Sequence, residues 1–318
     1  MILTLILFVG GFALLIKGAD FLVDGAASVA KKFNIPNIAI GLTIVAFGTS
    51  APEFAVNVFS SLSGKTDIAI GNIIGSNIAN IFLILGIAAV IYPLTVGRGT
   101  AWKEIPMSLL AATLLGFMAN DILIDGGVKN VITRIDGLVL LSFFIIFIYY
   151  IYGIAKSGNG LPTEEAKEMP MRRSAIFIIS GLVALVVGGK WIVDGAVAIA
   201  GFWGIRESII GLTGVAVGTS LPELATSAVE AYRKHTDIAI GNVVGSNIFN
   251  VFWIMGISSI INPLPLQQGG NYDIFVMALA SILLFTFLFI GKKHIIEKWQ
   301  GVLFIGIYIA YIASLFLL

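Results

Sequence analysis

The chain contains ten long apolar stretches with few charges, and this pattern restricts its fold more than any other feature. A helix needs about 20 predominantly apolar residues to cross the hydrocarbon core of a bilayer. The candidate stretches are residues 2–23, 38–62, 68–92, 104–120, 135–154, 174–199, 208–231, 238–262, 273–290 and 300–317. Only 12% of the residues are charged, against about 25% in a typical soluble domain, which excludes a water-soluble enzyme. The sequence predicts an all-α integral membrane protein with ten transmembrane helices.

Charge and cysteine content exclude further classes of protein. The formal net charge is +1, so the chain lacks the basic surface that nucleic-acid binding requires. It contains no cysteine, which excludes a disulfide framework, a thiol nucleophile and a zinc–thiolate site. The first apolar stretch lacks a basic leading segment and a small-residue cleavage site, so we expect a retained helix and not a signal peptide.

The distribution of cations predicts the orientation in the membrane. Lysine and arginine accumulate in cytoplasmic loops. If both termini are external, thirteen cations lie in the expected cytoplasmic loops and four in the external ones. The longest connection, residues 155–173, is polar and contains Pro162 and Pro170. We expect it to be a cytoplasmic linker between two five-helix halves, residues 1–154 and 174–318.

The two halves carry a clear internal repeat. Residues 41–87 align with residues 211–257 at a constant offset of 170, and 27 of the 47 positions are identical. The shared residues are largely Gly, Thr, Ser, Pro, Glu, Asp and Asn, so apolar composition does not explain the match. Because five spans is an odd number, the second copy must enter the membrane from the opposite side. The sequence therefore predicts two inverted-topology repeats, an architecture typical of secondary transporters with a binding site at the midplane.

One acidic residue lies near the middle of a predicted span in each copy. A carboxylate at this depth is costly unless it is paired, so Glu53 and Glu223 are functional candidates. Pro52 and Pro222 cannot donate a backbone hydrogen bond, which predicts a break in each helix just before the carboxylate. Irregular backbone at membrane depth is tolerated where it is covered by protein or lines a cavity. Hydroxyl groups share the face of each carboxylate, since Thr49 and Thr219 precede the glutamates by one turn.

The next helix of each copy supplies a polar stripe. The spacing i, i+4, i+8 places three side chains on one face in each copy; these are Asn72, Ser76 and Asn80, and Asn242, Ser246 and Asn250. Together with the glutamates they predict an all-oxygen site with two negative charges, which suits hard cations such as Ca²⁺. The absence of nearby His and Cys argues against zinc or copper. Asn72 and Asn242 have an alternative interpretation as interhelical hydrogen-bonding groups alone.

The motifs resemble those of a known family. GTSAPE (48–53) and GTSLPE (218–223), each followed by GNxxGSNxxN (71–80 and 241–250), are similar to the two α-repeats of the sodium/calcium exchanger family. The resemblance covers nearly the whole chain and is closest to the ten-helix prokaryotic type. It implies that the first and sixth helices slide across the other eight to alternate access.

The resemblance also implies a set of cation ligands. These would be Glu53 and Glu223, with hydroxyl or carbonyl oxygens of Thr49, Thr219, Ser50 and Ser220, the carbonyls of Ala46 and Ala216, and the side chains of Ser76, Ser246, Asn80 and Asn250. Some members of the family, potassium-dependent exchangers among them, carry Asp at the position of Asn250. The asparagine in this chain therefore weakens an interpretation as a K⁺ co-transporter. Proton-coupled relatives typically have a GNxxE pattern, which this chain lacks.

The resulting prediction is a non-enzymatic antiporter that exchanges Na⁺ for Ca²⁺ in a prokaryotic inner membrane, with no resident cofactor. Its partners are the two ions and the lipid bilayer, and no nucleic acid. Exchange of another divalent cation, or Ca²⁺ exchange coupled to H⁺ or K⁺, remains an alternative. A cation channel is a further alternative, but the repeat favours alternating access over a pore. An intramembrane enzyme is disfavoured, because neither a HExxH pair nor a Ser/Lys constellation is present.

Overall fold

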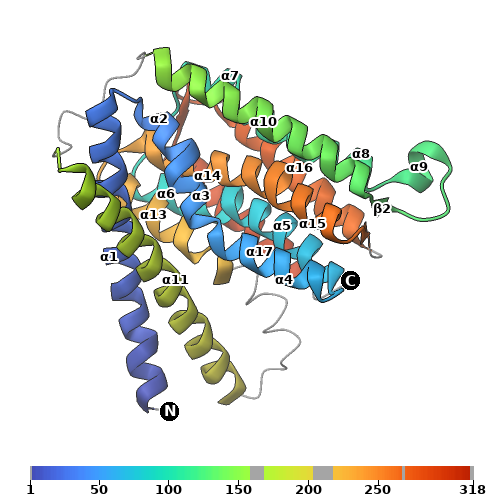
Figure 1. Cartoon of the computed structure of the whole chain (residues 1–318), viewed down its shortest axis with the longest axis horizontal. Coiled ribbons are helices and arrows are strands. Elements are labelled where there is room, and N and C mark those ends of the chain that lie inside the picture. The colour runs from blue at the N-terminus through green and yellow to red at the C-terminus, as the bar shows by residue number, and fades with distance from the viewer. Residues whose placement is uncertain (1, 158–167, 203–217, 267–268, 316–318) are drawn as a thin grey trace.

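The computed structural model describes residues 2–157, 168–202, 218–266 and 269–315 (Figure 1). Helices make up almost all of this part of the chain, as expected. In the first half the elements are α1 (Ile2–Phe33), α2 (Asn37–Ile40), π-helical η1 (Gly41–Val45), α3 (Ala46–Thr49), α4 (Ala51–Leu62), α5 (Thr66–Ala79), π-helical η2 (Asn80–Leu85), α6 (Gly86–Ile91), β1 (Leu94–Thr95), α7 (Arg98–Trp102), α8 (Glu104–Met118), α9 (Asp121–Asp125), β2 (Val131–Ile132) and α10 (Arg134–Ser157). In the second half they are α11 (Met171–Phe202), α13 (Leu221–Tyr232), α14 (Thr236–Ile248), π-helical η3 (Phe249–Met255), α15 (Gly256–Ile261), β3 (Leu264–Pro265), α16 (Gly270–Phe287), β4 (Ile295–Ile296) and α17 (Lys298–Leu315).

Seven of the described helices are long and apolar enough to cross a membrane, and a bent helix pair brings the number to eight. The bent pair is Asn37–Thr49 with Ala51–Leu62, and the helix axis bends by 47° between its two parts. The predicted span 104–120 corresponds to α8, whose 15 residues fall short of the usual length. The predicted span 208–231 lies partly outside the described residues. A multi-pass membrane protein is thus supported, and the number ten stays a prediction.

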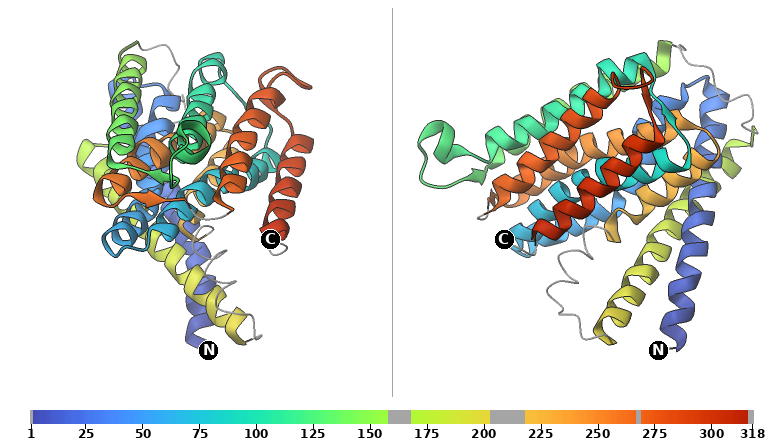
Figure 2. Two further views of the ribbon diagram at one scale, coloured as in Figure 1. Left: turned by 90° about the vertical axis from the view of Figure 1, so that its right-hand side faces the viewer. Right: turned by 180° about the vertical axis from the view of Figure 1, so that it is seen from behind.

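Helices α1 and α11 form a pair that projects from the remaining bundle (Figures 1 and 2). They pack along each other at very short distance because glycines lie at their contact. A Cβ atom at Gly18 would lie 2.9 Å from the backbone nitrogen of Leu185, and one at Gly181 would lie 2.5 Å from that of Leu22. Any larger side chain at these glycines would therefore push the two helices apart.

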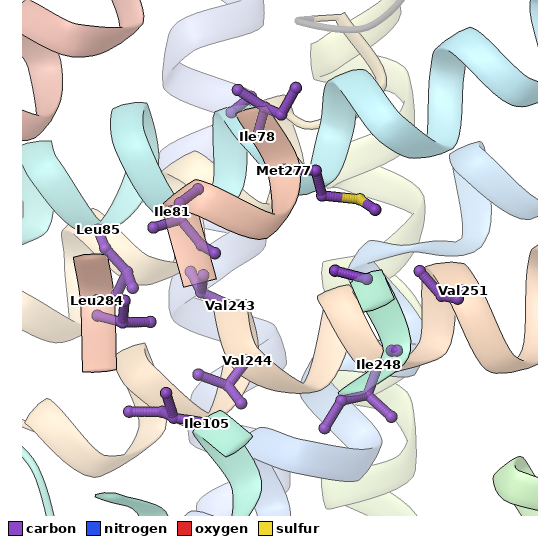
Figure 3. Packing of buried hydrophobic residues seen from close by; sticks show 14 of the residues in the cluster. Ile78, Ile81, Leu85, Ile105, Val243, Val244, Ile248, Val251, Met277 and Leu284 are labelled. Atoms are coloured by element: carbon purple, nitrogen blue, oxygen red, sulfur yellow. The ribbon is translucent and has the colours of Figure 1, made fainter. Parts of the chain in front are cut away.

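The centre of the bundle is built from the helices that carry the repeated motifs. Helix α5 with η2 and helix α14 with η3 are each 78% buried along their spans. Their apolar side chains pack against α16 and the start of α8, as Figure 3 shows for Ile81, Val243, Met277, Leu284 and Ile105. Glycines again permit close approach, since a Cβ atom at Gly245 would lie 2.8 Å from the Cβ of Ala46.

Short antiparallel strand pairs join the two halves in a reciprocal manner. Strand β1 of the first half pairs with β4 of the second, and β3 of the second half pairs with β2 of the first. Residues 94 and 264, where β1 and β3 begin, are related by the same offset of 170 as the repeat. Such reciprocal contacts are those expected of two equivalent units packed around a common axis. The inverted insertion into a membrane remains a prediction.

The connection between the halves is described only at its ends. Helix α10 continues to Ser157 and α11 begins at Met171, so each helix extends a few residues into the predicted linker 155–173. Residues 158–167 lie outside the described part of the chain.

Candidate cation site

The predicted helix breaks are present directly before the two glutamates. Ser50 separates α3 from α4 and has φ −79° and ψ 7°. Ser220 precedes α13 and has nearly the same geometry, with φ −87° and ψ 5°. A proline follows within the first two helical positions in both cases, where its missing N–H costs nothing. The proline thus ends one helical segment and starts the next, as the sequence indicated.

Each glutamate lies in the first turn of the helix after the break. Glu53 and Glu223 are third in α4 and α13, and each is only 1% exposed. The N-terminal end of a helix carries a partial positive charge that stabilises a carboxylate. The break therefore creates a favourable position for an acidic group inside an otherwise apolar bundle.

Serines at the two breaks bind the glutamate of the opposite half. Ser50 donates to Oε1 of Glu223 at 3.0 Å, and Ser220 donates to Oε1 of Glu53 at 3.2 Å. The two carboxylates therefore converge, although they are 170 residues apart in the sequence. The second oxygen of each, Oε2, is buried and has no hydrogen-bond partner among the described residues.

The threonines at the breaks are held in the same reciprocal way. Thr49 donates to Oδ1 of Asn242, and Thr219 donates to Oδ1 of Asn72, both at 3.0 Å. The amide nitrogen of Asn242 also donates to the hydroxyl of Ser227 at 2.9 Å. Asn72 and Asn242 thus make the interhelical hydrogen bonds that were the alternative interpretation of these residues.

The remaining predicted side chains lie on the two central helices. Ser76, Ser246, Asn80 and Asn250 are all at most 1% exposed. Ser246 donates to Oε1 of Glu223 at a distance of 3.5 Å, which places this face of α14 beside the carboxylate. In the part of the chain described, Oγ of Ser76 and Oδ1 of both asparagines have no hydrogen-bond partner. Together with the two Oε2 atoms, five buried oxygens lack a partner in this region.

The two predicted carbonyl ligands differ in what is described of them. The carbonyl oxygen of Ala46 accepts a hydrogen bond from the backbone nitrogen of Ser50 at 3.0 Å, and it lies 3.3 Å from the hydroxyl of Thr49, whose shorter contact is to Asn242. Since a carbonyl oxygen has two lone pairs, it can accept from Ser50 and still face a cation. Ala216 lies outside the described residues.

Asn77 and Asn247 are two further candidates that we did not predict, although both belong to the repeat. Asn77 and Asn247 are identical at the offset of 170, are 3% and 2% exposed, and hydrogen-bond to Asn250 and Asn80. They fall outside the i, i+4, i+8 stripe, which hid their relation to the site. Among the described residues, no group of three or more His, Asp and Glu side chains is placed to hold a metal ion.

The chain is similar to known proteins over nearly its whole length. The family model described as sodium/calcium exchanger protein matches residues 3–153 and 173–317. The chain is 36% identical over 325 residues to a putative antiporter, CaxA, from Alkalimonas amylolytica, with 99% of each chain covered. It is 31% identical to the sodium/calcium exchanger MaX1 from Methanosarcina acetivorans, with 96% of each covered. A solved structure of the sodium-calcium exchanger NCX_Mj superposes with a TM-score of 0.83 at 36% identity, covering 99% of both chains.

Proposed function

From the premise that this chain belongs to the sodium/calcium exchanger family, we propose that it exchanges Na⁺ for Ca²⁺ at the site between its two halves. The family and the membrane helices make it a multi-pass membrane transporter of the cation/Ca²⁺ antiporter kind. The specific ions and the residues that bind them are our proposal.

The convergence of the two glutamates supports this proposal most directly. Each carboxylate accepts a hydrogen bond from the opposite half through one oxygen and retains a second, unpartnered oxygen. Ca²⁺ binds six to eight oxygens in a flexible geometry, and its two charges would balance the two carboxylates. Several Na⁺ ions could occupy the same oxygens in its place, so the two kinds of ion would exclude each other.

The proposed ligands combine the unpartnered oxygens with groups that border them. Glu53 and Glu223 bind both kinds of ion, while the remaining groups complete the coordination. These are Thr49, Thr219, Ser50, Ser220, Ser76, Ser246, Asn80, Asn250 and the carbonyls of Ala46 and Ala216. Only a fully loaded site lets α1 and α11 move across the bundle and open the opposite side.

The exchange would be electrogenic if three Na⁺ move against one Ca²⁺. One net charge then crosses the membrane in each cycle, which at 100 mV is worth about 2.3 kcal/mol and shifts the equilibrium about fifty-fold. We place both termini outside a prokaryotic inner membrane, because this orientation puts thirteen cations in cytoplasmic loops.

Uptake of ⁴⁵Ca²⁺ into proteoliposomes driven by a Na⁺ gradient tests the proposal. We expect Glu53→Gln or Glu223→Gln to abolish uptake while the protein still folds, because a neutral amide cannot compensate a dehydrated divalent cation. Glu104→Gln is the matched control, since Glu104 is also buried but binds Tyr150 away from the site. Full transport in either glutamate variant would remove the proposed site.

The same vesicles distinguish the coupling ion and the divalent cargo. We expect external Na⁺ to compete with Ca²⁺, while K⁺ and a pH gradient neither replace Na⁺ nor increase uptake. Uptake driven equally well by K⁺ or H⁺ would overturn Na⁺ coupling. Stronger competition by Mn²⁺ than by Ca²⁺ itself would reassign the cargo.

A further inference from the structure

We infer that Asn77 and Asn247 are positioning residues that fix the amide orientation of Asn250 and Asn80, so that each presents oxygen and not nitrogen to the cation. The inference rests on the proposed function, because it concerns how that site selects a cation. It assigns a role to two residues that bind no ion themselves.

A backbone carbonyl determines how the Asn77 amide is turned. The Nδ2 of Asn77 donates to the carbonyl oxygen of Asn247 at 3.2 Å. A carbonyl oxygen can only accept, so this contact requires the NH₂ end of the Asn77 side chain. Its other end, Oδ1, is thereby directed to Asn250.

The orientation is then passed to the proposed ligand. The Oδ1 of Asn77 can only accept, and the Nδ2 of Asn250 donates to it at 2.9 Å. With its NH₂ group bound in this way, Asn250 must turn its own oxygen away from Asn77. That oxygen is buried without a hydrogen-bond partner in the described structure.

The same chain of contacts exists with the two halves exchanged. The Nδ2 of Asn247 donates to the carbonyl oxygen of Asn77 at 3.5 Å, and its Oδ1 accepts from the Nδ2 of Asn80 at 2.9 Å. The oxygen of Asn80 is likewise buried and unpartnered. Each positioning residue therefore orients the ligand of the opposite half, and two independent copies give the same orientation.

The oriented oxygens lie on the helix faces that border the carboxylates. Asn250 follows Ser246 by one helical turn, and Ser246 contacts Glu223. Asn80 follows Ser76 in the same way. An asparagine turned by 180° would direct its NH₂ group to this region, where it repels a cation. Asn77 and Asn247 thus make the uncharged side chains of Asn250 and Asn80 face a cation with oxygen, as a carboxylate does because of its charge.

A double-mutant cycle in proteoliposomes tests the inference. Asn77→Ala removes the acceptor that holds the Asn250 amide, and we expect the apparent KM for Ca²⁺ to rise about tenfold, as for one lost hydrogen bond. In an Asn250→Asp background the same Asn77→Ala change should leave KM unchanged or lower it. Aspartate has oxygen at both positions and needs no orientation, and its carboxylate opposes the Oδ1 of Asn77.

The background dependence separates positioning from a purely structural role. If Asn77→Ala raises KM equally in both backgrounds, Asn77 only supports the fold and the inference is wrong. Met277→Leu is the control, because Asn77 also contacts the sulfur of Met277 at 3.6 Å and this change leaves the amides intact. If Asn77→Ala does not fold, the mirror cycle of Asn247→Ala with Asn80→Asp gives the same test.

Failure of the inference is distinguishable from failure of the proposed function. A chain without Na⁺-driven Ca²⁺ uptake would contradict the function itself. The positioning role alone would be contradicted by a different result. In that case the chain transports Ca²⁺ and loses transport with Glu53→Gln, but Asn77→Ala has the same effect on KM whichever residue stands at position 250.

Discussion

Single residues in the site act across the boundary between the two halves. Serine, threonine and asparagine side chains of one copy bind the glutamate, asparagine or backbone of the other. A buried carboxylate that receives such a hydrogen bond keeps a fixed position, and a hydrogen bond to a charged group is worth about 1.5–3 kcal/mol. The carboxylates are consequently positioned by groups far away in the sequence.

We expect Ser50→Ala and Ser220→Ala to raise the apparent KM for Ca²⁺ by a similar factor, about tenfold each. Each change removes the hydroxyl that donates to the opposite glutamate, and the two contacts are nearly equal in length. Uptake of ⁴⁵Ca²⁺ at varied concentration measures the effect. Ser281→Ala is the control, because this buried serine donates only to its own helix. An effect confined to one of the two site serines would contradict their equivalence.

The residue scale also shows the limit of sequence reasoning. The glutamates and the polar stripe were predictable, because the repeat and the helical period mark them. Asn77 and Asn247 are one position from the stripe, on the side that meets the other central helix, so their contacts depend on how α5 and α14 pack. His235 follows the predicted span 208–231, and its Nδ1 lies 2.9 Å from Oε2 of the buried Glu230. Glu230 is itself an acidic residue in a predicted span, and the cost of its burial could have marked it.

At the scale of elements, helix breaks and glycine contacts bring the polar groups together. The prolines of the repeat predicted the helix breaks. The lengths of the segments were less predictable, because α1 continues to Phe33, well beyond the apolar stretch 2–23 that marked it. Three π-helical segments were not predicted either, since hydropathy does not report the hydrogen-bond pattern of a helix.

Gly245→Leu is expected to destabilise the bundle by about 1–3 kcal/mol, because a side chain there would collide with Ala46 and with the backbone of Leu42, 3.0 Å away. The melting temperature in detergent and Ca²⁺ uptake should both fall. Gly306→Ala is the control, since a Cβ atom at Gly306 meets nothing within 4 Å. Unchanged stability in Gly245→Leu would show that α14 does not need this close approach.

At the scale of the whole molecule, one ion-pair network joins the projecting α1–α11 pair to the bundle. Arg233, in the turn between α13 and α14, contacts Asp20 at 2.6 Å and Asp24 at 2.7 Å, both on α1. Burial lowers the pKa of Arg233, but the hydrogen bond and the charge of Asp24 raise it by more, so the pKa lies above its ordinary value. The side chain therefore remains charged.

The equivalent network does not form with the two halves exchanged, because only Asp24 has an identical counterpart. The residues at the offset of 170 are Ser63, Lys190 and Asp194, and Lys190 pairs with Asp194 at 3.0 Å on its own helix. If the two ends of a transport cycle are related by exchange of the two halves, the Arg233 network stabilises only one of them. Its partners are more than 200 residues apart, and neither Arg233 nor Asp20 is repeated in the other copy, so no sequence pattern indicates it.

We expect Arg233→Gln to shift the equilibrium away from the arrangement described here by about 1 kcal/mol, about fivefold in population. Distances between spin labels on cysteines introduced at the exposed positions Lys32 and Tyr232 measure this shift, and the chain has no native cysteine to interfere. Lys234→Gln is the control, because the ammonium group of Lys234 lies over the ring of Tyr92. If the labelled protein has the same distance distribution with Arg233→Gln as with Arg233, the network does not set the equilibrium.

The π-helical segments carry information about the origin of the molecule. Segment η2 covers residues 80–85 and η3 covers residues 249–255, so the offset of 170 places η2 within η3. A π-helical turn accommodates one residue more than an α-helical turn, and such turns are frequent at functional sites. If the two copies arose by duplication and fusion of one ancestral gene, the shared position implies that this gene already contained the irregularity. The widened helical turn beside the proposed site would then be older than the two-part transporter that now contains it.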